Sequence, residues 1–154
     1  MPIRSSHRVT PFLWFDGTAE DAARYYVSVF KKGSKVTNVS PMSVTFELEG
    51  QRFLALNGGP TFKFNEAVSF FVDSKDQREV DFFWKKLSDG GKPGRCGWLK
   101  DRWGLSWQII PRALGECLGG SDRAGAQRAM EAMLRMGKLD VKALRAAYKG
   151  GARR

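Results

Sequence analysis

The sequence has 154 residues, the length of one compact domain, and its composition excludes several classes of protein. Hydrophobic residues make up 42% of the chain and aromatic residues 12%, which is too much apolar material for a disordered protein. No apolar run approaches the roughly 20 residues of a membrane-spanning helix, and Met1–Thr10 lacks the apolar centre of a secretory signal. Cys96 and Cys117 suit free thiols, so we expect a cytoplasmic protein without a membrane partner.

The net charge of +10 raises the question of nucleic acid binding, so the position of the charge matters. Residues 112–154 hold ten Lys and Arg against four Asp and Glu, so more than half of the net charge lies there. The cations alternate with Ala, Leu and Met at helical spacing, which is typical of a solvated helix face. The sequence has no zinc-finger spacing and no aromatic RNA-binding motif. Nucleic acid is therefore not the expected partner.

An internal repeat organises most of the chain. A shift of 57 residues places Phe15-Asp16 on Val72-Asp73, Tyr25-Tyr26 on Phe82-Phe83, and Gly33 on Gly90. In each copy, a predicted strand, Pro11–Phe15 or Val68–Val72, precedes a helix with apolar residues at positions i, i+3, i+4 and i+7. Capping boxes at Thr18 and Ser74 indicate where the two helices begin.

Antiparallel strands follow each predicted helix. Alternation of apolar and polar residues predicts them at Val44–Glu49 and Arg52–Asn57 in the first copy, and at Cys96–Lys100 and Leu105–Ile110 in the second. The link between Val36 and Ser43 is short and contains Pro41, so we expect the middle hairpin of the first module to be abbreviated.

The segment after Pro111 differs in kind. Gly115, Gly119 and Gly120 are expected to break the chain before two short helices, Ala124–Met136 and Val141–Tyr148, of which the second is capped by Asp140. The apolar residues Met130, Met133, Leu134 and Met136 predict a packing face. We expect this face to dock on the domain or on a partner subunit.

These segments resemble the PhnB-like, or 3-demethylubiquinone-9 3-methyltransferase-like, branch of the glyoxalase, bleomycin-resistance and dioxygenase (vicinal oxygen chelate) superfamily. The motifs that carry the resemblance are Thr10–Gly17, the Glu20–Phe30 helix, Leu56–Pro60, Phe62–Val72, Cys96–Leu99 and Gly104–Pro111. The resemblance implies an α+β fold, in which two tandem βαβββ modules form a curved mixed sheet that encloses a cavity. It also implies a homodimer.

The resemblance and the repeat together predict the domain organisation. We expect a paired βαβββ domain at 1–111, with modules at about 8–59 and 65–111. A C-terminal helical extension at 112–154 follows it.

Metal-dependent relatives hold a divalent cation with four inward-facing residues, usually His or Glu. The resemblance carries these positions to Thr10, Asn57, Ala67 and Gln108, with Pro11 as the alternative to Thr10 if the loop is counted differently. Neutral amides and an alanine are poor ligands for such a cation. His7 lies upstream, and strand alternation turns Glu66 away from the side of Ala67, so neither is expected to replace a ligand. We therefore expect a cavity with no metal and no cofactor.

Strand alternation then predicts an aromatic cavity with a few amides and hydroxyls. In this prediction Phe53 and Ala55 share the face of Asn57. The candidate ligand-binding residues on the strands are Phe12, Trp14, Asn57, Ser69, Phe71 and Gln108, while Phe64 and Trp98, from loop or edge stretches, are expected to cover the mouth of the cavity. Such a lining suits a small organic molecule that is partly aromatic or apolar. The two amides are the strongest candidates, because a buried amide needs hydrogen-bond partners.

Three functions follow from these features. The first is a small-molecule-binding protein, like the resistance proteins of the superfamily. The second is a metal-independent isomerase or lyase, which would need an inward carboxylate such as Glu47, Glu66 or Asp101 to move a proton. The third is contact of the basic C-terminal tail with nucleic acid.

The methyltransferase name of the resembled family leads to a testable prediction. S-adenosylmethionine is usually held by a glycine-rich turn between a strand and a helix. Gly58-Gly59-Pro60 follows a predicted strand but leads to Thr61–Phe64, and the sequence contains no GxGxxG. We predict no binding of S-adenosylmethionine in isothermal titration calorimetry, and an affinity in the micromolar range would contradict this prediction.

Overall fold

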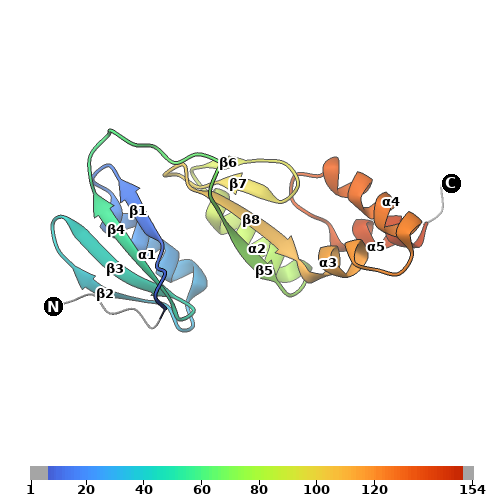
Figure 1. The fold of residues 1–154 in the computed structure, drawn as a ribbon, viewed down its shortest axis with the longest axis horizontal. Coiled ribbons are helices and arrows are strands. Elements are labelled where there is room, and N and C mark those ends of the chain that lie inside the picture. Colours follow the sequence, from blue (N-terminus) through green and yellow to red (C-terminus); the bar gives the residue numbers. More distant parts are fainter. Residues whose placement is uncertain (1–6, 151–154) are drawn as a thin grey trace. The chain divides into compact units, whose positions relative to one another are not determined.

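The computed structural model describes residues 7–150, and these form two compact units, one ending at Phe64 and one beginning at Asn65 (Figure 1). Each unit contains a four-stranded mixed sheet with a helix on one of its faces. Each unit has its own core.

The first unit is a βαβββ module. Its elements are β1 (Phe12–Phe15), α1 (Ala19–Phe30), β2 (Lys35–Val39), β3 (Ser43–Leu48) and β4 (Gln51–Asn57). The strand order is β1-β4-β3-β2, in which β1 runs parallel to β4 and the other neighbours are antiparallel. Alternate residues of the strands are buried on the side of α1, where Tyr26, Phe46 and Phe53 form the aromatic centre of the core.

The second unit repeats this topology and adds three helices. The module consists of β5 (Ser69–Ser74), α2 (Gln77–Ser88), β6 (Lys92–Pro93), β7 (Trp98–Lys100) and β8 (Ser106–Pro111), in the order β5-β8-β7-β6. Here β5 runs parallel to β8. Trp107 and Ile109 are buried on the side of α2. The α+β class and the repeated βαβββ pattern are therefore confirmed.

The abbreviated hairpin lies in the second module, so its prediction for the first module was wrong. In the first module β2 and β3 have five and six residues, and Pro41 lies in the connection between them, where it interrupts no ladder hydrogen bond. In the second module β6 has only two residues. Pro93 is the last residue of this strand, and the Gly94 N–H that follows it still donates to the Trp98 carbonyl at 2.8 Å.

Both predicted capping boxes are also wrong. Thr18 makes no side-chain cap, and the Ala19 N–H at the start of α1 donates instead to Oδ1 of Asn57, at 2.9 Å. Ser74 still belongs to β5, so the start of α2 moves to Asp76, whose carboxylate accepts from the N–H of Glu79 at 3.0 Å. The side chain of Asn57, from a distant strand, therefore caps α1, and Asp76, two positions after the predicted Ser74, caps α2.

The C-terminal helices α3 (Arg112–Leu118), α4 (Arg123–Leu134) and α5 (Val141–Lys149) pack against the second module. Their core consists of Ile110, Leu114, Leu139 and Leu144. The side chain of Gln77 in α2 donates to the Leu139 carbonyl at 3.1 Å and accepts from the Val141 N–H at 2.7 Å. These bonds tie the linker before α5 to the first turn of α2.

Three predictions about this segment have different outcomes. Asp140 caps α5 through the Ala143 N–H, as predicted. Gly115 does not break the chain but lies within α3, because burial of its neighbours outweighs the weak helix propensity of one glycine. The expected methionine face divides: Met133 and Met136 pack against the core, whereas the exposed fractions of Met130 and Leu134 are 37% and 55%.

Several cations of the basic segment have intramolecular partners. Arg128 donates from Nε to the Ala147 carbonyl at 2.9 Å and from Nη2 to the Tyr148 carbonyl at 2.7 Å, so it satisfies the C-terminal end of α5. Nζ of Lys138 lies 2.8 Å from Oδ1 of Asp81, and the hydrogen bond from Lys138 is the main cause that lowers the pKa of the Asp81 carboxyl.

Within residues 7–150, no helix has the length and apolar character needed to cross a membrane.

The turn between β7 and β8 is organised by a buried carboxylate. Only 3% of Asp101 is exposed. Its Oδ1 accepts from the backbone N–H groups of Trp103 and Leu105 at 2.9 and 3.0 Å, and its Oδ2 accepts from Nε1 of Trp107 at 2.9 Å. The carboxylate that the sequence offers as a possible catalytic group is therefore occupied in holding the turn.

We predict that Asp101→Ala destabilises the protein by about 3 kcal/mol, because it leaves three donors without their charged acceptor. Urea unfolding monitored by circular dichroism measures this change. The control is Asp89→Ala, which removes an exposed ion pair with Arg102 and should cost less than about 1 kcal/mol. Equal losses of unfolding free energy in the two variants would contradict the role of Asp101 in holding the turn.

Candidate functional site

On the sheet face opposite α1, the first module carries a fixed indole. Trp14 donates from Nε1 to the Gly59 carbonyl at 2.9 Å, and the ring of Phe62 meets it edge-on at 5.0 Å between centroids. A Cβ at Gly58 would lie 2.3 Å from the indole carbons, so only glycine fits there. The Gly58-Gly59 pair therefore serves to seat Trp14.

The other predicted residues of this module lie apart from one another. The exposed fraction of Phe12 is 58%, and alternation places it on the same face as Trp14. Phe64 instead contacts Phe15 edge-on, at 5.3 Å between ring centroids. Phe15 belongs to the buried side of the sheet, so Phe64 is not held beside Trp14 by this contact.

Asn57 lies on the side of α1, which corrects its prediction as a cavity residue. Its register partner in β1 is Phe15, whereas Trp14 is paired with Leu56. Its amide is used at both ends, since Oδ1 accepts from the Ala19 N–H and Nδ2 donates to the Pro41 carbonyl at 3.2 Å. A shift of one residue along a strand exchanges the two faces of the sheet.

The same correction applies to the residues that were predicted to share the face of Asn57. Phe53 and Ala55 do share it, but it is the buried face beneath α1. Leu54 and Leu56 instead share a face with Phe12 and Trp14, as their pairing shows.

The second module brings its predicted residues together on the face opposite α2. Trp98 and Phe71 are both register partners of Gln108, so the three residues share one face of the sheet. Gln108 donates from Nε2 to Oγ of Ser69 at 2.9 Å. The exposed fraction of Phe71 is 62%.

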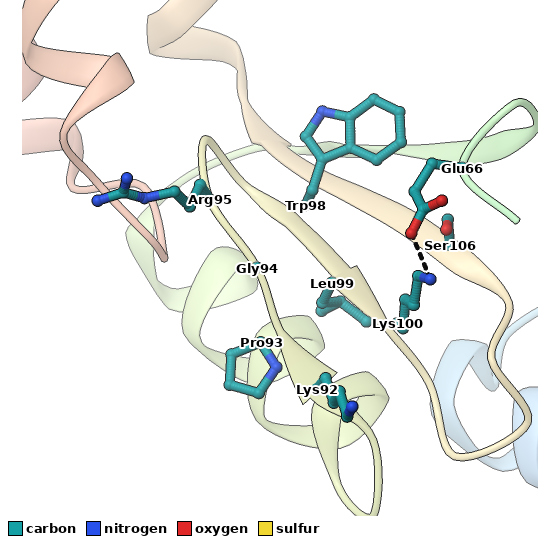
Figure 2. Close-up of a pocket in the computed structure, with 9 residues that line it drawn as sticks. All are labelled: Glu66, Lys92, Pro93, Gly94, Arg95, Trp98, Leu99, Lys100 and Ser106. Carbon is teal, nitrogen blue, oxygen red and sulfur yellow. Dashed lines mark ion pairs between the residues drawn. The ribbon is translucent and has the colours of Figure 1, made fainter.

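A pocket of about 580 Å³ lies beside this group. Its lining residues are Glu66, Lys92, Pro93, Gly94, Arg95, Trp98, Leu99, Lys100 and Ser106. Figure 2 shows the indole of Trp98 and the paired side chains of Glu66 and Lys100 on one side of the sheet, whereas the guanidinium of Arg95 points away from them. Of the predicted ligand-binding residues, Trp98 lines this pocket.

Glu66 forms an ion pair with Lys100 at the pocket (Figure 2). The hydrogen bond from Lys100 is the main cause that lowers the pKa of Glu66 below its usual value. The favourable interaction is therefore present above the usual carboxyl pKa and is lost as the pH falls through the lowered value. The expectation that Glu66 turns away was wrong, because β5 begins only at Ser69 and strand alternation does not apply to residue 66.

Ser106 is the most unusual polar group of the pocket. It is 1% exposed, and its hydroxyl has no hydrogen-bond partner among the described residues. Ser106 is the register partner of Lys100, and Lys92 is paired with Lys100 on the other side. From the sequence, alternation with Trp98 could have predicted Lys100 on the sheet face opposite α2. Lys92 could not be predicted in this way, because the two-residue strand β6 shows no alternation.

The residues at the superfamily's metal positions do not fit a divalent cation. Thr10 and Ala67 lie before the first strand of their modules, and Ala67 has no donor atom in its side chain. Asn57 is engaged as described, and Gln108 offers a neutral amide already bonded to Ser69. Among residues 7–150, no group of three or more His, Cys, Asp or Glu is placed to hold a metal. We assign no chemical step to a metal.

A sequence model of the 3-demethylubiquinone-9 3-methyltransferase family matches residues 7–110. The chain belongs to this family. The PhnB protein of Bacillus cereus is 29% identical, with 68% of this chain and 99% of that protein covered and a TM-score of 0.63. A protein of Pseudomonas aeruginosa is 17% identical, with 69% and 98% covered and a TM-score of 0.59.

A glyoxalase-related enzyme of Fulvimarina pelagi also shares the fold. It is 15% identical, with 68% of this chain and 88% of that protein covered and a TM-score of 0.50. A comparison with curated proteins finds no match. The fold of this family member is therefore glyoxalase-like.

We predict that Asn57→Ala destabilises the protein by about 1–2 kcal/mol, because the first N–H of α1 loses its acceptor. Chemical unfolding measures this loss. Asn57→Asp keeps an acceptor near the positive end of α1 and should retain most of the stability. Asn38→Ala on the exposed strand β2 is the control and should change stability by less than about 0.5 kcal/mol. No loss at Asn57 would show that the cap is unimportant.

Proposed function

We propose that this family member binds a small, partly apolar organic molecule on the face of the second sheet opposite α2. The observation that carries the proposal is the pocket lined by an indole, two lysines and a buried hydroxyl that has no partner within residues 7–150. A buried polar group without a partner is uncommon in folded proteins, because leaving it unpaired costs free energy. A ligand that accepts or donates a hydrogen bond at Ser106 would remove this cost.

The surroundings of the hydroxyl suit such a molecule. Trp98 supplies a flat apolar surface, and Ser69, Phe71 and Gln108 continue the same face with an aromatic ring and hydrogen-bonding groups. Small-molecule sites typically combine an apolar lining with a few placed polar groups. The glyoxalase-like fold is compatible with this role but does not specify it.

Methyl transfer has less support from the structure. The family name implies a methyl donor, yet the Gly58-Gly59 turn is filled by the indole of Trp14. The chain after this turn continues as a loop to Phe64 and not as a helix, so it offers no helix N-terminus to a donor. These residues do not fit the donor.

A metal-independent isomerase or lyase is the second candidate. Glu66 lines the pocket, and this is the inward carboxylate that such an enzyme would require. A carboxylate beside an ammonium can take up or release a proton during a reaction. The chemistry would then occur beside Trp98, at the same pocket.

Native mass spectrometry of freshly purified protein tests the binding proposal. We expect a retained small molecule in the wild-type protein and its loss in Trp98→Leu, because the substitution removes the flat surface of the pocket. Trp103→Leu is the matched control, since Trp103 lies in the β7–β8 turn and does not line the pocket. The same spectra report whether the chain forms the homodimer that we also propose.

Equal retention by both variants, or no retained molecule together with no binding of any aromatic probe, would refute the proposal. Incubation of a retained ligand with the protein in D2O separates the two candidates. Incorporation of solvent deuterium into the ligand would favour the enzyme, and an unchanged ligand would favour binding alone.

A further inference from the structure

We propose that the ligand of this pocket is an organic anion with a flat apolar part, whose oxyanion takes the place of the Glu66 carboxylate beside Lys100. This inference rests on the proposed function and specifies the ligand class. Three features of the pocket support it: its charge balance, the exposure of Glu66 and the position of Ser106.

The pocket has more positive than negative charge. Lys92 and Lys100 are direct cross-strand partners in β6 and β7, and like charges in this arrangement repel. Glu66 is the single acid among the lining residues, whereas Lys92 and Lys100 are cations. Glu66 is paired with Lys100. One positive charge of the two lysines therefore remains unbalanced, and a bound anion would balance it.

Glu66 is placed where a ligand can displace it. Its side chain is 61% exposed, and it lies in the turn before β5, outside the sheet ladder. Exposed ion pairs contribute little to stability, so their separation costs little. The buried carboxylate of Asp101 differs in this respect, because it accepts three hydrogen bonds and its displacement would disrupt the β7–β8 turn.

Ser106 provides the donor that an incoming oxyanion needs. It is the register partner of Lys100, so the two side chains extend from the same face of the sheet. The hydroxyl is covered in the free protein and has no partner among the described residues, so it can donate to an oxyanion that enters where the Glu66 carboxylate leaves. Trp98 lies on the same face as Lys100, two residues away in β7, and its indole offers a stacking surface for an attached ring.

Calorimetry with three probes of similar size tests this ligand class. Benzoate and phenyl phosphate each carry an oxyanion on an aromatic ring, and benzyl alcohol is the neutral counterpart. We expect at least one anion to bind about 10-fold or more tightly than benzyl alcohol at low ionic strength, and added salt to reduce this difference. The tighter of the two anions identifies carboxylate or phosphate as the preferred group.

Three variants test the contacts of the anion. Two of them should weaken its binding, and the third should strengthen it. Lys100→Gln should weaken binding of the anion by about 10-fold, because it removes the paired charge. Glu66→Gln should strengthen it severalfold, because a competing carboxylate is lost. Ser106→Ala should weaken it while the urea midpoint stays the same or rises, since the lost hydroxyl has no partner in the described part of the free protein. Lys85→Gln, on α2 at the other face of the sheet, is the control and should change nothing.

The outcomes separate this inference from the proposed function. Equal binding of benzyl alcohol and the anions, with loss in Trp98→Leu, would overturn the inference and leave the binding function intact. Weaker anion binding in Glu66→Gln would also overturn it, because the carboxylate would then assist the ligand. If none of the three probes binds and no molecule is retained in native spectra, both proposals fail.

Discussion

In each module the first strand pairs with the last in parallel, and the register of this pairing decides which side chains face the helix. Phe15 opposite Asn57 and Trp14 opposite Leu56 define the two faces of the first sheet, and Phe71 opposite Gln108 defines the corresponding face of the second. Because side chains alternate with a period of two, no residue of these strands can change its face alone. The core, the indole of Trp14 and the pocket beside Trp98 all depend on this register.

Much of the fold could be predicted from the sequence, because repetition and alternation are local and add up over many residues. The repeat between Phe15 and Val72 recovered both modules, and alternation in residues 44–49 found β3. The prediction for Asn57 failed for a different reason. Alternation correctly placed Asn57 on one face with Phe53 and Ala55, but only the pairing with β1 and the bond from the Ala19 N–H show that this is the face beneath α1.

The pocket was harder to predict than the fold. Trp98 was predicted as an aromatic residue at the mouth of the cavity, but Glu66 and Lys92 come from a turn and a two-residue strand, where no periodicity exists. Lys92 and Glu66 come together through Lys100, which is the cross-strand partner of Lys92 and the ion-pair partner of Glu66. A buried hydroxyl without a partner, as at Ser106, can be recognised only once the atoms around it are placed.

The segment beyond the family match has a structural consequence of its own. The match ends at residue 110, whereas Leu114, Leu139 and Leu144 complete a core around Ile110. The backbone N–H groups of Cys96 and Gly97, just before β7, donate to the carbonyls of Met136 and Gly137. In this chain the helices beyond residue 110 thus share a core and backbone hydrogen bonds with the second module. Their sequence and that of the strand bearing Trp98 are therefore expected to change together during evolution.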